Sequence, residues 1–382
     1  MKILIIGYGA VGETLTKILA KENSIKNISC IDYIEKKILK NKKVSFQKFD
    51  VSDSISFLDL LKRNEFDLAI NTSIPKLNLQ IMKSCLEARI NYMDAASFWD
   101  YDKNPKAKVP YKMEQLDYHK KFAEKNILGL IEAGVAPGLD NMFAAQAASE
   151  LDEVDYIKIR MVEDTGSNEI FFSWNKDWLL DELASKPIIY ENGKWSFVES
   201  FGAEEEFEFP KPIGKRKTYY FCQDEVGSIP QYIKTKKLDV KIHDNNIDIS
   251  RKLLAQMTNS KKKLDEIYKT LPDSVPGEEK KFPNSIFAFA VEAIGKKYGK
   301  KLAVRYSIVF PKQRDINKIC PGANFISYPT ALSMKLFTIA FDKIKERGVF
   351  PPESLEKKVR DFIISELPKN HVKIYKKVYT PK

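Results

Sequence analysis

The sequence predicts an α/β protein of two domains, in which a doubly wound parallel sheet is followed by an α+β domain with a mostly antiparallel sheet. Strand-like and helix-like runs alternate from Lys2 to about residue 135, as they do in parallel sheets covered by helices. After Gly138, strand-like runs follow one another closely, which is typical of antiparallel sheets. The length of 382 residues also exceeds what a single compact core usually holds.

The first domain is expected to span residues 1–138. Ser52 is the expected N-cap of its second helix, and Pro75 ends its fourth strand. The expected strands are residues 2–6, 27–33, 43–51, 66–75, 91–96 and 127–138, and the expected helices are residues 12–22, 52–64, 76–90 and 115–126.

The second domain is expected to span residues 139–319. Residues 251–282 are lysine-rich with a helical centre, and a lid, a small helical insertion and a mobile excursion all remain open for them. Pro351 and Pro352 begin a further turn, so residues 351–382 are expected to form a tail helix. The other expected strands are residues 154–164, 169–174, 218–223, 236–242, 287–294 and 301–310, and the other expected helices are residues 139–151, 178–184 and 328–348.

Composition indicates a soluble globular chain, with 43% hydrophobic and 30% charged residues. No apolar run approaches the roughly 20 residues that span a bilayer, and no small-residue cleavage site follows the first strand. The four cysteines (30, 85, 222 and 320) and three histidines (119, 243 and 371) lack metal-ligand or redox spacing. We therefore expect a cytoplasmic protein with buried thiols, no metal and no membrane partner.

The formal net charge of +11 permits two interpretations. A basic surface attracts nucleic acid, yet no basic stripe carries interleaved aromatic residues and no nucleic-acid motif is present. Lysines are scattered among glutamates, as in "KKKLDEIYK". The charge therefore favours anionic small ligands, such as carboxylates or nucleotide phosphates, and no nucleic-acid partner is expected.

The stretch "GYGAVG" at residues 7–12 follows an apolar strand and opens a helix, which is the pattern of a dinucleotide-binding turn. Gly7 permits the tight turn, Gly9 lets the backbone approach a pyrophosphate, and Gly12 lets the helix pack closely. The helix N-terminus, at Ala10 and Val11, offers N–H groups to the phosphates. The alternative is a glycine-rich turn that only joins a strand to a helix.

Asp32 ends the second strand twenty residues after Gly12, where a carboxylate accepts hydrogen bonds from the adenosine ribose. A carboxylate there repels the extra phosphate of NADP, so NAD is favoured as the cofactor. Lys36 and Lys37 could pair with that phosphate, so NADP stays open.

Ligands of doubly wound sheets bind at the carboxyl ends of the strands. The sequence therefore predicts that the segments "NTSIP", "DAASF" and "AGVAPG" face the nicotinamide half of the cofactor. The expected cofactor-binding residues at these strand ends are Asp50, Val51, Thr72, Ser73, Pro75, Gly134 and Pro137.

Five segments together resemble the saccharopine dehydrogenase-like oxidoreductases, which include saccharopine reductases, carboxynorspermidine dehydrogenases and lysine 6-dehydrogenases. They are "GYGAVGETL", "TSIPKLNLQIMKSCLEARINYMDAA", "IEAGVAPGLDNMFA", "FFSWNKDWLLDELASKPIIYENGKW" and "YPTALSMKLFTIAFDKIKERGVFPPE". The resemblance implies a Rossmann domain, a substrate-binding and dimerisation domain, and a segment at about 320–350 that returns to the Rossmann side.

The resemblance also implies the chemistry, in which hydride passes between nicotinamide and a carbon bonded to nitrogen. Imine reduction or secondary-amine oxidation of a lysine- or polyamine-related amino acid is the first hypothesis, and lysine 6-dehydrogenase-like deamination is the alternative. A homodimer is expected from the family. A hypothesis of another class is a Rossmann protein that senses the dinucleotide without turnover.

The resemblance carries over to particular residues. Asp140 matches an acidic position near the substrate amine, so it is the expected acid/base or ammonium-orienting group, and helix capping is the alternative. The expected substrate-binding residues are Asn141, Trp174, Arg160, Arg305 and Asn324, of which the tryptophan and the arginines are proposed from their residue types and positions alone. The alternatives are helix capping for Asn141, a core position for the tryptophan, and solvent exposure or a salt bridge for the arginines. Trp178 is a second candidate wall of the pocket.

Two departures from the family leave the substrate open. The stretch "DEVGSIP" lacks the arginine that fungal-type saccharopine reductases carry shortly after the strand matching "TYYFCQ". Ala136 stands where those enzymes have an acidic residue before the proline. The family is therefore better defined than the substrate, and the missing arginine leaves room for the sensor hypothesis.

Overall fold

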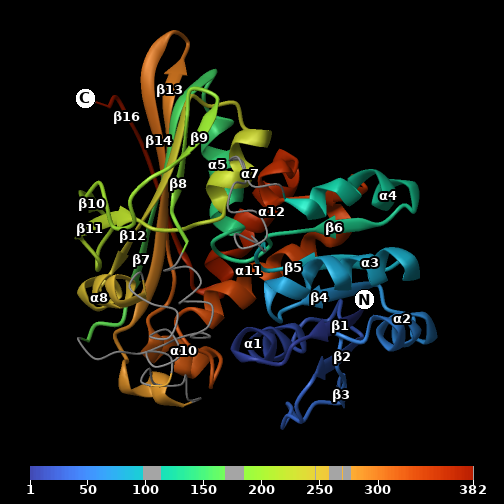
Figure 1. Ribbon diagram of the computed structural model, residues 1–382. Coiled ribbons are helices and arrows are strands. Elements are labelled where there is room, and N and C mark those ends of the chain that lie inside the picture. Colours follow the sequence, from blue (N-terminus) through green and yellow to red (C-terminus); the bar gives the residue numbers. More distant parts are fainter. Residues whose placement is uncertain (98–112, 168–184, 246, 258–268, 270–276, 382) are drawn as a thin grey trace. The chain divides into compact units, whose positions relative to one another are not determined.

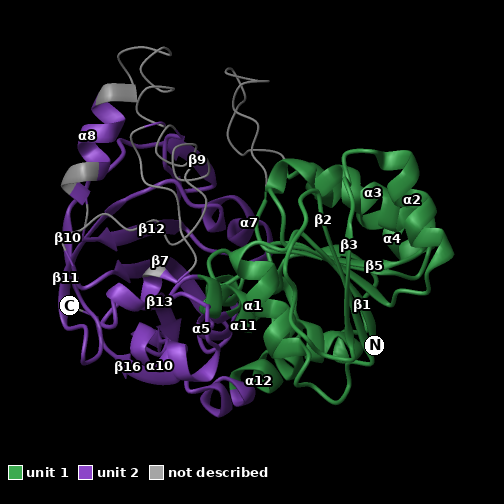
Figure 2. Cartoon of the chain, turned by 90° about the horizontal axis from the view of Figure 1, so that it is seen from below, with its two compact units in different colours: residues 1–100, 111–142, 327–364 green, residues 101–110, 143–326, 365–382 purple. Residues whose placement is uncertain are grey.

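The computed structural model describes residues 1–97, 113–167, 185–245, 247–257, 269 and 277–381 (Figure 1). It confirms the predicted fold class, a parallel sheet with helices and a second, mostly antiparallel sheet. The described chain divides into two compact units (Figure 2). Unit 1 holds the described residues of 1–100, 111–142 and 327–364, and unit 2 holds those of 143–326 and 365–382.

Unit 1 is built on a sheet of seven described strands in the order β15-β6-β5-β4-β1-β2-β3, and every pairing in it is parallel. Ile3, Leu4 and Ile5 of β1 are fully buried, as expected for a central strand covered on both faces. The strands are β1 (Lys2–Ile6), β2 (Asn27–Asp32), β3 (Val44–Lys48), β4 (Leu68–Asn71), β5 (Asn91–Asp94), β6 (Leu128–Leu130) and β15 (Gly348–Phe350).

Helices cover both faces of the unit 1 sheet (Figure 2). On one face α1 (Ala10–Leu19) packs against α11 (Ser327–Ala340), and Lys335 of α11 forms an ion pair with Glu22 at 2.7 Å. The other face carries α2 (Ser54–Arg63), α3 (Asn78–Ala88) and α4 (His119–Glu124), and α12 (Lys357–Glu366) follows β15 in the chain. Short 3-10 turns lie at Pro75–Leu77, Glu114–Tyr118, Phe341–Lys343, Pro352–Ser354 and Pro368–Asn370.

Unit 2 is built on a sheet of nine described strands. Its order is β10-β11-β12-β7-β13-β14-β16, with β8 beside β12 and β9 beside β8, and β12–β7 is its parallel pair among the described strands. The strands are β7 (Glu153–Asp164), β8 (Ile188–Glu191), β9 (Lys194–Phe197), β10 (Glu205–Glu208), β11 (Lys215–Tyr220), β12 (Lys237–Asp244), β13 (Ile286–Lys297), β14 (Lys300–Val309) and β16 (Lys373–Tyr379).

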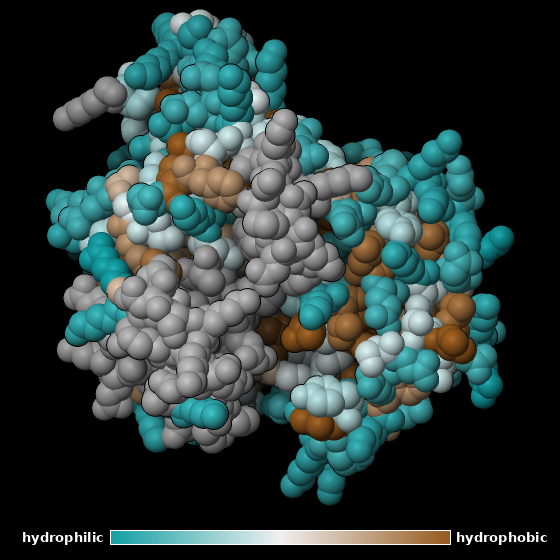
Figure 3. All heavy atoms as spheres, viewed as in Figure 1, coloured by the Kyte–Doolittle hydropathy of each residue, from teal (hydrophilic) through white to brown (hydrophobic). Residues whose placement is uncertain are grey.

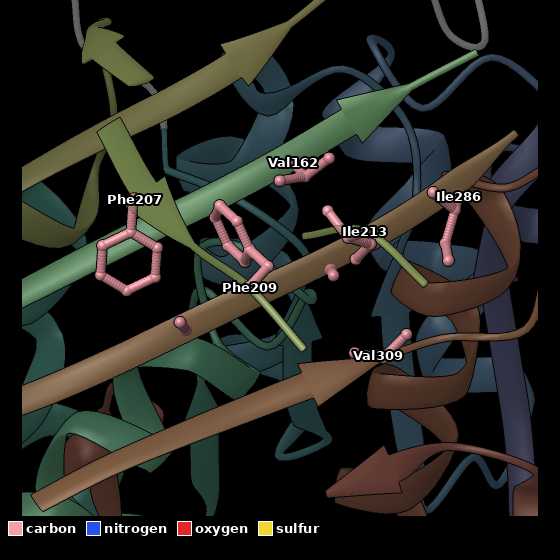
Figure 4. Close-up of a cluster of buried hydrophobic side chains, with 8 residues drawn as sticks. Val162, Phe207, Phe209, Ile213, Ile286 and Val309 are labelled. Atoms are coloured by element: carbon pink, nitrogen blue, oxygen red, sulfur yellow. The ribbon is translucent and has the colours of Figure 1, made fainter. Parts of the chain in front are cut away.

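The long central strands of unit 2 separate two packed faces because successive side chains point to opposite sides. Val162, Ile286 and Val309 contribute to a buried cluster that Phe207 and Phe209 complete (Figure 4). On the other side, Phe289 packs against Phe143 of α5 (Leu139–Ala148), with ring centroids 5.9 Å apart. The remaining helices of the unit are α7 (Glu225–Tyr232), α8 (Ile247–Met257) and α10 (Gln313–Ile319), with a 3-10 turn at Glu278–Lys281.

The C-terminal part of the chain differs from the prediction. The helix expected over 328–348 ends at Ala340, and Gly348 then begins β15, which pairs with β6. Gly348 has φ +126°, a conformation that helices exclude. The tail expected as a helix over 351–382 contains α12 and then β16, an edge strand paired with β14.

Smaller differences concern caps and short strands. Asp53, not Ser52, caps α2, because its carboxylate accepts the Ser56 N–H at 3.1 Å. Strands β8, β9 and β10 and helices α7 and α10 were not predicted, and β11 ends at Tyr220 rather than at residue 223. The expected strand 169–174, the expected helix 178–184 and most of residues 251–282 lie outside the described residues.

The surface is rich in charge. On the face shown in Figure 3, hydrophilic residues cover most of the described surface. Many lysines of the described chain form ion pairs with carboxylates, as Lys17 does with Glu13 at 2.7 Å. Across the described residues, the structure holds no helix long and apolar enough to cross a membrane.

Candidate functional site

The glycine-rich turn after β1 is closed by contacts that admit only glycine at two positions. Gly7 has φ +89°, and a Cβ on it would lie 2.7 Å from the Ser73 nitrogen. A Cβ on Gly12 would lie 2.0 Å from the Gly7 carbonyl oxygen. Helix α1 therefore starts in direct contact with the turn, as the sequence predicted.

Gly9 differs, because a Cβ on it would meet nothing within 4 Å. Gly9 and Ala10 are exposed, and the first helical hydrogen bond of α1 runs from Glu13 N–H to the Gly9 carbonyl at 2.9 Å. The N–H groups of Ala10, Val11 and Gly12 precede that bond and point out of the helix N-terminus. The turn thus presents an open backbone surface at Gly9 beside three N–H groups that make no hydrogen bond within the helix, which fits the pyrophosphate of a dinucleotide.

Asp32 is held beside this turn. Its carboxylate accepts the Tyr8 N–H at 2.7 Å and the Ile34 N–H at 3.1 Å. Tyr33 and Ile34, which follow it, are 69% and 43% exposed. Sequence reasoning did not single them out, because exposure of a side chain cannot be read from the sequence.

Tyr8 connects the turn to the loop that carries Lys36 and Lys37. Its side chain is 3% exposed, and its hydroxyl accepts the Leu39 N–H at 3.3 Å. Burial raises the pKa of Tyr8 to about 12, so the hydroxyl stays protonated. The lysine-bearing loop is therefore anchored to the predicted phosphate turn.

The ends of β3 and β4 lie around the same turn. Thr72 donates its hydroxyl to the Gly7 carbonyl at 2.7 Å, and Ser73 donates both N–H and hydroxyl to Asn71 Oδ1. Asp50 is exposed, and hydrogen bonds from Ser52 lower its pKa. Two further predicted residues complete this edge, the buried Val51 and Pro75, which begins a 3-10 turn.

A fully buried polar network joins the carboxyl ends of β4, β5 and β6. Asp94 accepts the Gln115 side-chain amide at 2.6 Å and the Glu132 N–H at 2.8 Å. Glu132 accepts the Ser97 hydroxyl at 2.7 Å. Asn71 and Asn78 continue the network to the Ala96 carbonyl. Sequence reasoning missed this network, and its only signal was a set of polar residues at the last positions of buried strands.

The turn from Gly134 to Gly138 leads from β6 into α5. Gly138 has φ +133°, and a Cβ on it would lie 2.4 Å from the Gly134 carbonyl oxygen. A Cβ on Gly134 would lie 2.5 Å from the Ala95 carbonyl oxygen. Pro137 lies within this tightly packed turn, which begins directly after the polar network.

Asp140 and Asn141 are fully buried at the start of α5. Asp140 Oδ1 accepts the N–H groups of Asn141 at 2.8 Å and Gly138 at 3.1 Å. Asn141 also accepts the Gly138 N–H and donates its amide to Glu353 at 3.2 Å. Both side chains therefore stabilise the turn, and Glu353 is a partner that sequence reasoning missed.

The predicted substrate arginines lie in unit 2 and are engaged by carboxylates. Arg160 is 1% exposed and forms ion pairs with Asp239 at 2.6 Å and Glu205 at 2.7 Å. Arg305 pairs with Glu292 at 2.5 Å and stacks over the Phe207 ring. Such pairing is the salt-bridge alternative that the sequence left open.

The other predicted substrate residues divide between described and undescribed parts. Asn324 accepts the Ile326 N–H at 3.0 Å just before α11, whereas Trp174 and Trp178 lie outside the described residues. A carboxyl that sequence reasoning missed is Glu163 at the end of β7. Burial, with a contribution from the Asp244 charge, raises its pKa to about 8.

Within the described parts of the chain, no group of three His, Cys, Asp or Glu residues could hold a metal ion. All four cysteines lie in the described residues and form no disulfide, and three of them are buried. Burial raises the pKa of the Cys30 thiol to about 11, which suppresses its reactivity.

Fold and site together define a dinucleotide-binding protein of the Rossmann type joined to a second α+β unit. The sequence profile of the saccharopine dehydrogenase NADP binding domain matches residues 3–130, and that of the saccharopine dehydrogenase C-terminal domain matches residues 134–372. The chain belongs to the saccharopine dehydrogenase family, as its sequence motifs predicted.

Two curated relatives share part of the chain. Carboxynorspermidine synthase of Vibrio alginolyticus is 32% identical over 258 residues, which cover 63% of this chain and 62% of the relative. Carboxyaminopropylagmatine dehydrogenase of a Synechocystis species is 28% identical over 247 residues, covering 62% of this chain and 60% of the relative. The matches thus span less than two thirds of those relatives.

A solved structure shares the fold over nearly the whole chain. The apo, histidine-tagged saccharopine dehydrogenase (L-Glu forming) of Saccharomyces cerevisiae superposes with a TM-score of 0.68 at 13% identity. The match covers 99% of this chain and 100% of that one. At this identity the likeness establishes the fold alone.

Proposed function

We propose that this chain is an NAD(P)-dependent oxidoreductase that transfers hydride at a C–N bond of a lysine- or polyamine-related amino acid. The observation that carries the proposal is the glycine-rich turn, with an open face at Gly9, free helix N-terminal donors and a fixed Asp32 carboxylate. The names of both relatives contain a carboxylated polyamine, which favours such a molecule as the substrate class.

The nucleotide would be held by residues of unit 1. The amides of Ala10, Val11 and Gly12 would bind the pyrophosphate, and Asp32 would accept the adenosine ribose hydroxyls. Asp50, Val51, Thr72, Ser73, Pro75, Gly134 and Pro137 would line the rest of the site. When bound, the nicotinamide supplies or accepts the hydride.

Asp140 is the proposed acid/base or ammonium-orienting group. One carboxylate oxygen accepts two N–H groups, which orients the carboxylate. A charged Asp140 can orient a substrate ammonium or take a proton from an amine. Asn141, at the same helix start, is the proposed hydrogen-bonding partner for the substrate.

Trp174, which lies outside the described residues, and Asn324 remain proposed substrate residues, while the contacts of Arg160 and Arg305 favour a structural role for both arginines. Deamination of the lysine 6-dehydrogenase type is the alternative reaction at the same bond.

The experiment pairs nucleotide binding with turnover. NADH and NADPH are titrated by fluorescence and then mixed with lysine or a diamine together with aspartate semialdehyde or a 2-oxo acid. We expect binding, and oxidation of the nucleotide only when amine and carbonyl are both present. Binding without turnover in either direction would favour a dinucleotide sensor, and no binding would exclude both.

We further propose that the protein is a homodimer in the reducing cytoplasm. The buried cysteines, which form no disulfide, support that compartment, and the family resemblance supports the dimer. Light scattering of the purified chain tests the dimer, and fractionation of cells tests the location.

A further inference from the structure

Asp94 fastens the segment that follows β6. Its Oδ1 accepts the Glu132 N–H at 2.8 Å, and its main-chain carbonyl accepts the Ala133 N–H at 2.8 Å. Its Oδ2 accepts the Gln115 side-chain amide at 2.6 Å. One residue at the end of β5 therefore fixes two successive peptide groups after β6.

The segment so fixed adopts a backbone that glutamate disfavours. Glu132 has φ +53°, in the left-handed region that non-glycine residues rarely occupy. Such a conformation persists only where its surroundings impose it. Two hydrogen bonds impose it here. The Asp94 carboxylate accepts the Glu132 N–H, and the Ser97 hydroxyl donates to the Glu132 carboxylate.

Main-chain contacts connect the segment that contains Glu132 with the start of α5, where Asp140 lies. The Gly134 carbonyl accepts the Leu139 N–H at 3.0 Å, and the Val135 carbonyl accepts the Asp140 N–H at 3.2 Å. The Glu132 carbonyl oxygen also packs closely on Gly138, because a Cβ added to Gly138 would lie only 2.5 Å from that oxygen. A shift at Glu132 would therefore displace the turn and the start of α5.

Asp94 is buried at a cost to stability. It is 1% exposed, and burial raises its pKa from 3.8 to about 6. Hydrogen bonds from the Gln115 side-chain amide and the Glu132 N–H oppose that shift. The other titratable groups beside it are the Tyr92 hydroxyl, the Glu132 carboxyl and the Cys85 thiol next to Tyr92. Buried carboxylates of this kind are typical of functional sites.

We propose that Asp94 is a positioning residue, whose ionised carboxylate holds residues 132–138 in the conformation that presents Asp140. The inference rests on the proposed function, since it assigns Asp94 a task in that same site. It predicts that protonating Asp94 loosens the turn while the rest of the sheet stays folded.

The test compares Asp94→Asn with two further variants. Asp94→Asn keeps the size of the side chain and an oxygen that can accept the Glu132 N–H, but it removes the negative charge. Its amide NH2 group would then face the Gln115 amide, which is also a donor. The double variant Asp94→Asn/Gln115→Glu restores an amide–carboxylate pair with the charge on the other side. Asp67→Asn is the matched control, because Asp67 also accepts a strand N–H, from Lys2 at 2.7 Å, at the amino edge of β1.

The first readout is hydrogen exchange of residues 132–140, which needs no substrate. We expect protection of the Glu132 and Ala133 amides in the parent protein to fall as the pH drops through about 6. In Asp94→Asn it should be low at every pH, and the double variant should regain part of it. Equal protection in Asp94→Asn and the parent protein would overturn the proposal.

The second readout is turnover of the amine and carbonyl pair found by the screen. Asp94→Asn should lower turnover about ten-fold and lose the acidic limb of the pH profile, with NADPH affinity unchanged. An acidic limb retained in Asp94→Asn would also overturn the proposal. If the parent protein shows no turnover, the proposed function fails, and the exchange measurement still decides the role of Asp94.

Discussion

The Tyr8 N–H donates to the Asp32 carboxylate at 2.7 Å, so a residue inside the glycine-rich turn is tied to the last residue of β2. This contact holds the carboxylate beside the surface that would receive a pyrophosphate. The hydroxyl of the same tyrosine accepts the Leu39 N–H from the loop that bears Lys36 and Lys37. The two proposed determinants of cofactor choice, the Asp32 carboxylate and the loop that carries the two lysines, are thus both hydrogen-bonded to Tyr8.

Replacing Asp32 should change the cofactor preference. In Asp32→Ser the repulsion of a 2′-phosphate and one acceptor for the ribose are both lost. The ratio of the NADH to the NADPH dissociation constant should therefore rise about ten-fold. Fluorescence titration measures both constants, with Asp67→Ser as the matched control at the opposite edge of the sheet. An unchanged ratio would show that Asp32 does not face the ribose.

The buried charge of Asp94 should make stability depend on pH. Its pKa is raised from 3.8 to about 6, so its favourable contribution is complete below 3.8, is lost as the pH rises to about 6, and stays lost above. The shift corresponds to about 3 kcal/mol. Denaturant unfolding of the parent protein and Asp94→Asn should show their free energies of unfolding diverging by about this amount between pH ~4 and ~8. A difference independent of pH would refute the shift.

That stability trend separates two explanations of an acidic limb in activity. Protonation removes the cost of burying the Asp94 charge and so stabilises the whole fold at low pH. It also weakens the hydrogen bond from the Glu132 N–H, which favours the ionised carboxylate, and so loosens the turn and lowers activity. A fall in turnover below pH ~6 without loss of folded protein would therefore indicate that the turn has loosened and that the protein has not unfolded.

Arg160 should prove structural. Removing its guanidinium in Arg160→Met leaves the buried carboxylate of Asp239 without a cation, so the free energy of unfolding should fall by about 3 kcal/mol or more. Lys215→Met is the control, because its 2.7 Å ion pair with Glu206 is exposed and worth little. KM of the folded fraction should be unchanged in Arg160→Met. A raised KM with normal stability would instead support the carboxylate-binding role.

Asp140→Asn should separate capping from chemistry. Asparagine retains an acceptor for the N–H groups of Gly138 and Asn141 but cannot exchange a proton at this position. We expect kcat to fall about 100-fold or more, with an unchanged NADPH dissociation constant and melting temperature. Loss of stability with normal kcat per folded molecule would leave Asp140 as a cap alone.

The sequence predicted the elements whose patterns are local. The alternation of strands and helices, the glycine-rich turn and Asp32 all follow from short-range spacing, and the structure confirms the fold that they indicate. Gly348 and the strand it begins could not be predicted, because β15 is defined by pairing with β6, more than 200 residues away in sequence. The same holds for β16, whose partner is β14.

The parts of the site that were missed depend on tertiary contacts. Asp94 and Glu132 are separated by 38 residues, and nothing local shows that they share a hydrogen bond. Arg160 illustrates the converse, since a strand arginine fits a substrate carboxylate or a salt bridge equally well until Asp239 and Glu205 are placed beside it.

The most direct test of the central claim is dinucleotide binding by Gly9→Ala. Gly9 has φ −83°, which alanine adopts freely, and its Cβ would project into open space. The melting temperature should therefore match that of the parent protein, while NADH and NADPH affinity should fall about 100-fold because the methyl group occupies the place of the pyrophosphate. Equal affinity in both proteins would contradict the account, since no pyrophosphate could then rest on this turn.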